Sequence, residues 1–294
     1  MSASTDDARG RVLAGIPVTE RRLESAGIPT AVLEGGEGPP VVLLHGGIGC
    51  GGASWAPVLG SLTQRHRVVV PDLPGLGESA PVDRLDVETF TDWFVGLLEQ
   101  TAPEKPTVVA HSLGGSLAVR FATRRADLVH RFIIGGATGI GRYRMPLGLR
   151  VAAIRVGVRP TERNNERFER WALLDLDRTR GRNPEWFDAF NAYSLAREAM
   201  PHVKRTVRSL IKVETKQIPE AELLRIDVPT TLFWGRHDRM VPVGLARGAS
   251  SRFRWPLHVI DDAGHVPHLE QPEAFLCVVS DILSGSRQTE GEPS

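Results

Sequence analysis

Two periodicities of apolar residues alternate along most of this chain. Short runs of apolar, mostly β-branched residues lie at 41–46, 67–72, 107–112, 131–137, 230–235 and 256–261. Such runs are typical of parallel strands whose two faces are both covered. Segments with helical spacing separate them, for example Val87, Phe90, Phe94, Leu97 and Leu98. The pattern predicts an α/β fold, with helices on both faces of a mostly parallel sheet.

The alternation stops near residue 138 and resumes near residue 228. The interval has helical patterns and no strand signal, so we expect a helical lid at 138–227, inserted into a core formed by 19–137 and 228–285. Both ends of the chain are polar and rich in small residues. We therefore expect flexible segments at 1–18 and 286–294.

Charge is distributed unevenly, although the whole chain has a net charge of only +1. Residues 139–212 contain 16 Lys and Arg and 8 Asp and Glu, a local net charge of +8 that leaves −7 for the rest. The favoured interpretation is a set of solvated helix faces with surface ion pairs. The alternative is a basic entrance to a substrate pocket, which would attract anionic, carboxylate-bearing substrates. The near-neutral total gives no reason to expect nucleic acid as a partner.

Composition also limits the location of the protein. No run approaches the roughly 20 apolar residues of a membrane span, and the first residues have neither a secretory nor a transit signal. The two cysteines, Cys50 and Cys277, are too few for a disulfide framework. We expect a soluble, cytoplasmic protein whose two thiols are packed. Cys277 is predicted to lie on a helix and to point into the protein core.

The strongest local motif is Ala110-His111-Ser112-Leu113-Gly114-Gly115, at the end of a predicted strand and the start of a helical pattern. A tight turn between strand and helix needs small neighbours, and Ala110 and Gly114 provide them. Ser112 would then project alone as a nucleophile. The simple alternative is a serine that only caps the helix.

A serine nucleophile requires a base and an acid that orients the base. Asp238 follows the predicted strand at 230–235, and His265 follows the next one. The neighbouring histidines His111, His237 and His268 fit the role of base less well; we expect the side chain of His111 to point away from the site. Asp261 and Asp262 are too near His265 in sequence to replace Asp238 easily.

These segments resemble the α/β-hydrolase family, whose nucleophile elbow reads G-x-S-x-G and whose triad follows the order Ser, Asp, His. Ala110 in place of the first glycine is a departure. The resemblance covers about 40–137 and 228–284 and implies an eight-stranded sheet, with the lid where family members carry a cap. His45-Gly46-Gly47 resembles the family's oxyanion turn, which implies the backbone N–H groups of Gly47 and Leu113 as donors, with Ile48 second to Gly47.

A rival interpretation uses the same glycines. Gly47, Gly49 and Gly52 form a literal G-x-G-x-x-G after a strand, and Asp72 could be the ribose-binding acid of a nicotinamide-dependent oxidoreductase. That interpretation leaves the triad order unexplained, so Asp72 is better viewed as a hydrogen-bonding strut. A non-catalytic ligand receptor on the same fold is a third class.

We therefore expect a serine hydrolase that cleaves an ester or related acyl bond of a small, partly apolar substrate and needs no metal or organic cofactor. The segment HGGIGCGGASW also resembles the loop of C–C hydrolases that act on ring-fission dienoates. Those enzymes usually have Trp after the catalytic histidine, whereas this chain has Val266, which favours an esterase. Aromatic residues of the lid line a pocket or, more simply, pack its helices.

Overall fold

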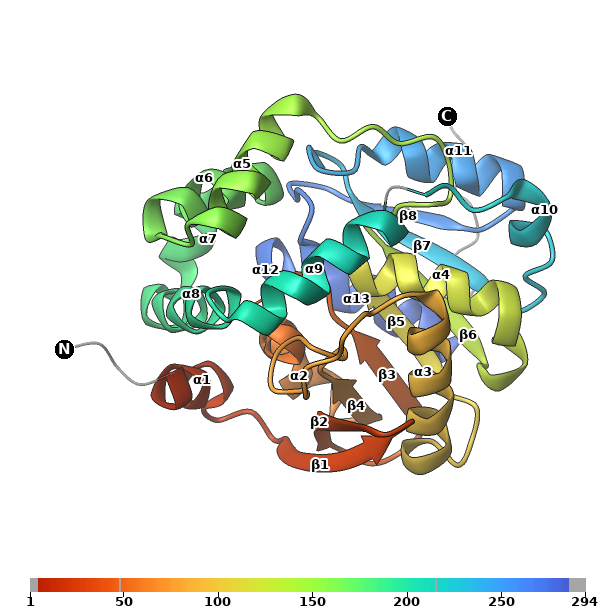
Figure 1. Cartoon of the computed structure of the whole chain (residues 1–294). Helices are drawn as coiled ribbons and strands as arrows, with labels where there is room; N and C mark the ends of the chain where they lie inside the picture. Colours follow the sequence, from red (N-terminus) through yellow and green to blue (C-terminus); the bar gives the residue numbers. More distant parts are fainter. Residues whose placement is uncertain (1–4, 48, 215, 286–294) are drawn as a thin grey trace.

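The computed structural model describes residues 5–47, 49–214 and 216–285, arranged around an eight-stranded sheet (Figure 1). The strands are β1 (Thr19–Ser25), β2 (Ile28–Gly35), β3 (Pro40–Leu44), β4 (Arg67–Pro71), β5 (Thr107–His111), β6 (Arg131–Gly135), β7 (Thr230–Gly235) and β8 (Leu257–Ile260). Their order is β1-β2-β4-β3-β5-β6-β7-β8, and the six strands from β4 to β8 in this order are parallel. The mostly parallel sheet predicted from the sequence is confirmed, as is each of its six apolar runs.

The strands β1 and β2 form an antiparallel hairpin at one edge of the sheet. A two-residue turn joins them, and both of its residues, Ala26 and Gly27, have positive φ (48° and 75°), as a tight hairpin turn requires. Most side chains of β1 are exposed and polar. Because an edge strand of this kind has no continuous apolar run, the run pattern did not single it out.

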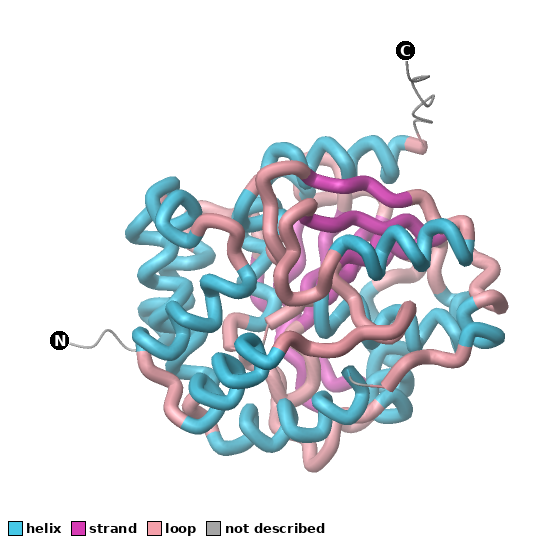
Figure 2. Tube along the Cα trace, turned by 90° about the horizontal axis from the view of Figure 1, so that it is seen from above, coloured by secondary structure: helices cyan, strands magenta, loops and turns pink. Residues whose placement is uncertain are grey.

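Helices cover both faces of the sheet, and Figure 2 shows the strands between them. Alternate residues of a strand point to opposite faces, so Val42 and Leu44 pack on one side, and Val41 and Leu43 on the other. The first side is covered by α3 (Val87–Thr101), α4 (Ser112–Arg125) and α11 (Val243–Phe253). The second is covered by α2 (Ala56–Leu62) and α13 (Pro272–Ser284).

Between β6 and β7 lies a run of helices, here called the helical insertion (residues 138–227). Its helices are α5 (Leu147–Val158), α6 (Glu162–Ala172), α7 (Leu176–Arg182), α8 (Pro184–Glu198), α9 (Pro201–Glu214) and α10 (Glu220–Leu223). Side chains of Thr161, Asp175 and Asn183 accept backbone N–H bonds at the starts of α6, α7 and α8. In Figure 1, α5 to α8 stack at one side of the molecule and α9 crosses back towards the sheet.

The aromatic side chains of α8 serve mainly to pack the helices. Phe187, Phe190 and Tyr193 are buried, and Trp186 stacks on Phe190 with ring centroids 5.0 Å apart. These residues share apolar clusters with α1 (Thr5–Leu13), the η1 segment (Gly51–Trp55) and α7. Packing is therefore sufficient to explain them.

The start of the chain differs from the flexible segment expected for 1–18. Residues Thr5–Leu13 form a helix, α1, that lies beside α8, and its Ala8 and Val12 are buried. The indole N–H of Trp186 donates to the carbonyl of Val12 over 3.1 Å. Two small apolar residues one turn apart are enough to dock this helix, although the segment is polar on average. The expected tail at 286–294 lies outside the described residues.

The remaining short elements are η1 (Gly51–Trp55), η2 (Ala126–Leu128) and α12 (Pro267–Glu270). Both cysteines are free, with Cys50 buried as expected. Cys277 is exposed, so its predicted place in the core was wrong: Phe275, Val279 and Ile282 form the inner face of α13, and Cys277 lies on the outer one. None of the helices in the described ranges is long and apolar enough to cross a membrane.

Candidate active site

The turn that carries Ser112 is strained. Strand β5 ends at His111 and α4 begins at Ser112, whose φ of 50° lies in the left-handed region that residues with a side chain rarely adopt. A conformation of this kind costs on the order of 1–3 kcal/mol and persists only where the surroundings impose it. The hydroxyl is thereby held at the carboxyl edge of the sheet, partly exposed between two buried neighbours.

Two glycines allow the surroundings to impose this turn. A Cβ on Gly114 would lie 2.7 Å from the carbonyl oxygens of both Leu44 and His45, and the N–H of Gly114 donates to the latter over 3.1 Å. A Cβ on Gly46 would lie 2.7 Å from the Cβ of Ser112. The loops after β3 and β5 thus touch through their backbones, at a distance that a larger residue would prevent.

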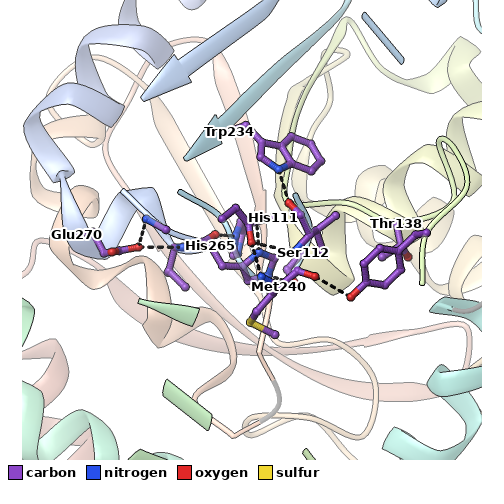
Figure 3. A network of polar contacts seen from close by, with 12 residues as sticks. His111, Ser112, Thr138, Trp234, Met240, His265 and Glu270 are labelled. Carbon is purple, nitrogen blue, oxygen red and sulfur yellow. Dashed lines mark hydrogen bonds and ion pairs between the residues drawn. The ribbon is translucent and has the colours of Figure 1, made fainter. Parts of the chain in front are cut away.

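The structure brings Ser112, His265 and Asp238 together at the same edge of the sheet. Figure 3 shows Ser112 beside His265. The Nε2 atom of His265 lies 2.8 Å from the hydroxyl oxygen of Ser112, and its Nδ1 atom lies 2.8 Å from Oδ2 of Asp238. The other oxygen of Asp238 accepts the N–H groups of Met240 and Val241, each over 2.8 Å. Asp238 and His265 are buried, so water hardly competes for these bonds.

The neighbouring histidines have other contacts. The ring of His111 does not point away from the site; it lies in the interior, where Nε2 is 2.6 Å from the main-chain oxygen of His265. His268 stacks on Trp55 with ring centroids 4.1 Å apart. Burial, reinforced by the neighbouring imidazoles, moves the pKa of His111 well below its usual value and that of His268 to about 3. Both rings are therefore neutral near pH 7.

The other candidates from the sequence are placed on the surface. His237 is exposed, and so are Asp261 and Asp262. Asp261 forms an ion pair with Arg236. Of these candidate acids and bases, Asp238 and His265 are the pair that is hydrogen-bonded, and His265 links this pair to Ser112.

Sequence reasoning missed Glu270, whose carboxyl group fixes the loop of His265 through hydrogen bonds to its backbone. Its Oε1 atom accepts the N–H groups of Gly264 (2.8 Å) and Val266 (3.3 Å), the two residues that flank His265. Its Oε2 atom accepts the N–H of Leu174, in the helical insertion, over 2.6 Å. Burial raises the pKa of this carboxyl group to about 7. The only signal in the sequence was a glutamate five positions after the histidine.

The helical insertion is bonded to the loops of Asp238 and His265. The N–H of His265 donates to the carbonyl of Ala172 over 2.6 Å. The guanidinium group of Arg239, the residue after Asp238, donates to the carbonyl of Leu173. Three consecutive residues of the insertion, 172–174, therefore contact both loops, and the position of the base depends on the link between α6 and α7.

The two expected oxyanion donors belong to the two segments that pack together at Ser112. Leu113 is in the first turn of α4, where backbone N–H groups have no acceptor within the helix. Gly47 follows Gly46, the residue in contact with Ser112, and has a φ of 70°. Ile48, the second choice to Gly47, lies outside the described residues.

The loop of Gly47, Gly49 and Gly52 does not have the geometry of a dinucleotide site. It continues into η1, a short 3₁₀-helix. Asp72 is buried, and its two carboxyl oxygens accept the N–H groups of Gly52 (2.5 Å) and Glu78 (2.7 Å). The acid thus ties two backbone segments together, as a strut does, and is not available to bind a ribose hydroxyl.

The loop after β3 contains Cys50, and the charged groups of the insertion that affect the pKa of this thiol are carboxyl groups rather than arginines. Burial raises the pKa of the Cys50 thiol, and the charges of Glu198, Asp72 and Glu169 add to this effect. Burial raises the pKa values of Glu169 and Glu198 to about 7 each. Some arginines of the insertion instead form exposed ion pairs, for example Arg180 with Asp188 at 2.7 Å. These pairs fit the solvated surface favoured by the sequence.

Within the described ranges, no group of three or more His, Cys, Asp and Glu side chains is placed to hold a metal ion. The polar network in Figure 3 instead runs through His111, Ser112 and His265, with Glu270 at one end and Thr138 at the other.

The sequence of this chain is similar to those of known hydrolases. The chain is 27% identical over 284 residues to a 2-hydroxymuconate semialdehyde hydrolase of Pseudomonas sp. (strain CF600), covering 91% of this chain and 95% of that protein. It is 28% identical over 247 residues to a pimeloyl-[acyl-carrier protein] methyl ester esterase of Nitrosomonas europaea, covering 82% and 94%.

Among solved structures, a carboxylesterase from Bacillus subtilis has a similar fold. It superposes with a TM-score of 0.80 at 21% identity, covering 96% of this chain and 98% of that one. The model of the alpha/beta hydrolase family matches residues 41–276, which include the elbow, the acid and the histidine. The chain belongs to the alpha/beta hydrolase family.

Proposed function

We propose that Ser112, His265 and Asp238 form the catalytic triad of an esterase that acts on a small, partly apolar substrate through an acyl-enzyme. The observation that carries this proposal is the chain of two 2.8 Å contacts, from the serine hydroxyl to the imidazole and from the imidazole to the carboxylate. A carboxylate at Nδ1 keeps the proton on that nitrogen, so that Nε2 can accept the proton of the hydroxyl.

In the first half-reaction the hydroxyl oxygen of Ser112 attacks the acyl carbon as its proton passes to Nε2 of His265. The carbonyl oxygen becomes negatively charged, and the N–H groups of Gly47 and Leu113 stabilise it. Collapse of the tetrahedral intermediate breaks the bond to the leaving alcohol, which takes the proton from His265. In the second half-reaction His265 removes a proton from water as the water oxygen attacks the acyl carbon. Collapse of this second intermediate breaks the bond to the Ser112 oxygen, which takes the proton back from His265, and the acid is released.

Cleavage of a C–C bond in a dienoate acid is the second candidate, and it is favoured by the name of the Pseudomonas relative. Two features of this chain favour ester cleavage. Val266 stands where dienoate hydrolases usually have Trp, and the carboxyl groups of Glu169, Glu198 and Asp72 raise the pKa of Cys50, in the loop after β3. Above about pH 7, where Glu169 and Glu198 are mostly ionised, they would repel the carboxylate of a dienoate.

The test is turnover of p-nitrophenyl esters of increasing acyl length, alongside a panel of ring-fission dienoates, by the wild type and Ser112→Ala. We expect ester turnover by the wild type that falls at least about a thousandfold in the variant. A fluorophosphonate probe should label the wild type at Ser112 and leave the variant unlabelled. Exposed Ser61 provides a matched control, because Ser61→Ala should change neither rate nor labelling.

Two results would contradict the proposal. Equal ester turnover by the wild type and Ser112→Ala would remove the role of Ser112. Turnover of dienoates without turnover of esters would replace the esterase by a C–C hydrolase. Titration with NAD(H) and NADP(H) tests the oxidoreductase alternative, and tight nicotinamide binding by a chain that does not hydrolyse esters would favour it.

A further inference from the structure

Helix α5 of the insertion is apolar on two opposite faces. Its inner face, with Leu149, Ala152 and Val156, is buried against the rest of the molecule. Five of the seven large apolar side chains that are clearly exposed in the described ranges belong to Met145 and the outer face of α5. The four on the helix are Leu147 (74% exposed), Val151 (40%), Ile154 (60%) and Val158 (75%). Burial of the inner face does not explain them.

The four outer residues form one stripe. They are spaced by four, three and four positions, which places them along the same side of an α-helix. Arg150 and Arg155 lie roughly 70° to either side of this stripe at about 100° per residue. Both arginines are exposed, so α5 has an aliphatic ridge with a guanidinium group on each flank.

The charge around this ridge has a single sign. Residues 139–161 contain five arginines and no Asp or Glu, and all five are exposed: Arg142, Arg144, Arg150, Arg155 and Arg159. None of the ion pairs formed between described residues involves these five side chains. Other arginines of the insertion, such as Arg170 and Arg180, do have acidic partners. The five guanidinium groups are thus available to anions outside the molecule.

We propose that the outer face of α5 binds the surface of an anionic lipid bilayer. A helix that lies in the headgroup region needs an apolar side that enters the acyl boundary and cations that reach the phosphates beside it. The ridge and its flanking arginines provide both. Two copies of this face would bring five positive charges against five, so charge disfavours a symmetric dimer here. Figure 1 shows α5 at the top of the stacked insertion helices.

The proposed contact uses a single three-turn helix. Binding should therefore be reversible, and it should weaken as salt screens the arginines from the lipid headgroups. The surface lies apart from the residues that contact Ser112, so this proposal does not depend on the proposed function.

The experiment is flotation of the full-length protein with vesicles, one set of phosphatidylcholine alone and another with one third phosphatidylglycerol. We expect the wild type to float with the anionic vesicles, less so at high salt, and not with the neutral ones. The triple variant Leu147→Ser, Ile154→Ser, Val158→Ser should lose at least about tenfold in partitioning. Arg150→Gln, Arg155→Gln, Arg159→Gln should lose a similar amount together with the salt dependence.

A matched control changes one exposed leucine and two exposed arginines elsewhere, as Leu224→Ser, Arg65→Gln, Arg247→Gln, and should bind as the wild type does. Circular dichroism shows whether each variant is folded. The proposal is wrong if the wild type does not float with anionic vesicles, or if the triple serine variant floats equally well. A wild-type dimer in sedimentation, converted by the serine substitutions to a monomer that still floats, would assign the ridge to self-association and overturn it.

Discussion

The loops at the carboxyl edge of the sheet and the outer helix of the insertion are specified in different ways. At the edge, backbone contacts decide the structure: Gly114 touches the carbonyl of His45, and Gly46 touches Ser112. Helix α5 is fixed only by its inner face, and its outer residues are unconstrained by the fold. Positions of the first kind tolerate almost no added atom, whereas positions of the second kind are available for contacts outside the molecule.

The insertion that carries α5 contacts the loops at this edge through residues 172–174. Here the insertion contributes the carbonyl of Ala172 to His265 and the N–H of Leu174 to Glu270. The contrast is therefore one between the inner and outer surfaces of the same insertion.

The largest effect should come from Asp238→Asn. The amide cannot hold the imidazole in the tautomer that accepts the serine proton, so kcat should fall by about 10³–10⁴. The backbone bonds from Met240 and Val241 can persist, which separates this effect from misfolding. Ester kinetics and a thermal melt measure the two quantities. A variant with near wild-type kcat would show that another acid orients His265.

Glu270→Ala should have the next largest effect. It removes the acceptor for three N–H groups around His265, and a shift of the imidazole of about 1 Å can reduce kcat by about 10–100-fold. KM should change little, since Glu270 does not reach the substrate side of the ring. Glu273→Gln, an exposed change on α13, is the matched control. Glu270→Gln is the conservative variant. If it recovers none of the rate lost by Glu270→Ala, and if both variants also lose thermal stability, the role of Glu270 is purely structural.

Gly114→Ala and Gly60→Ala compare a crowded glycine with an open one. The new Cβ at 114 would meet two backbone oxygens at 2.7 Å, whereas a Cβ at 60 would have nothing within 4 Å. We expect the first change to destabilise the fold by about 1–3 kcal/mol and the second, within a helix, to stabilise it by about 0.5–1 kcal/mol. Urea denaturation measures both. Equal changes at the two sites would show that the elbow has room to adjust.

The smallest effect concerns the buried carboxyl groups of the insertion. Burial raises the pKa of Glu198 from 4.5 to about 7, so the folded chain binds more protons than the unfolded chain between these values. Stability should therefore fall as the pH rises through this window. Glu198→Gln should stabilise the protein by about 1–2 kcal/mol at pH 8 and by almost nothing at pH 4.5. Glu185→Gln, exposed on the same helix, should show no such difference, and a pH-independent gain at 198 would contradict the assigned cause.

Much of the central sheet and the membership of the candidate site could be predicted because their signals are local. Apolar runs gave the six parallel strands, and the small residues around Ser112 gave the elbow. Asp238 and His265 could be chosen because parallel strands end at a common edge, which brings the loops after β5, β7 and β8 together. Chain order was enough to select them.

Other features depended on contacts between distant segments. Nothing in the sequence near Glu270 shows that its carboxyl group would bind Leu174, 96 positions earlier in the chain. The polar average of 1–18 concealed two small residues that dock α1 on α8. The net positive charge of the insertion likewise gave no indication that its Glu169 and Glu198 would raise the pKa of the Cys50 thiol.

The sequence by itself determined the six parallel strands, the tight turn at Ser112 and the choice of Asp238 and His265 as candidate acid and base, because periodicity, small residues and chain order are properties of neighbouring positions. Only the tertiary structure decided which charges of the insertion face inward, that Glu270 holds the loop of His265, and that one side of α5 is left bare. These outcomes depend on which surfaces are excluded from water when distant segments pack, and that is settled only when the whole chain is folded.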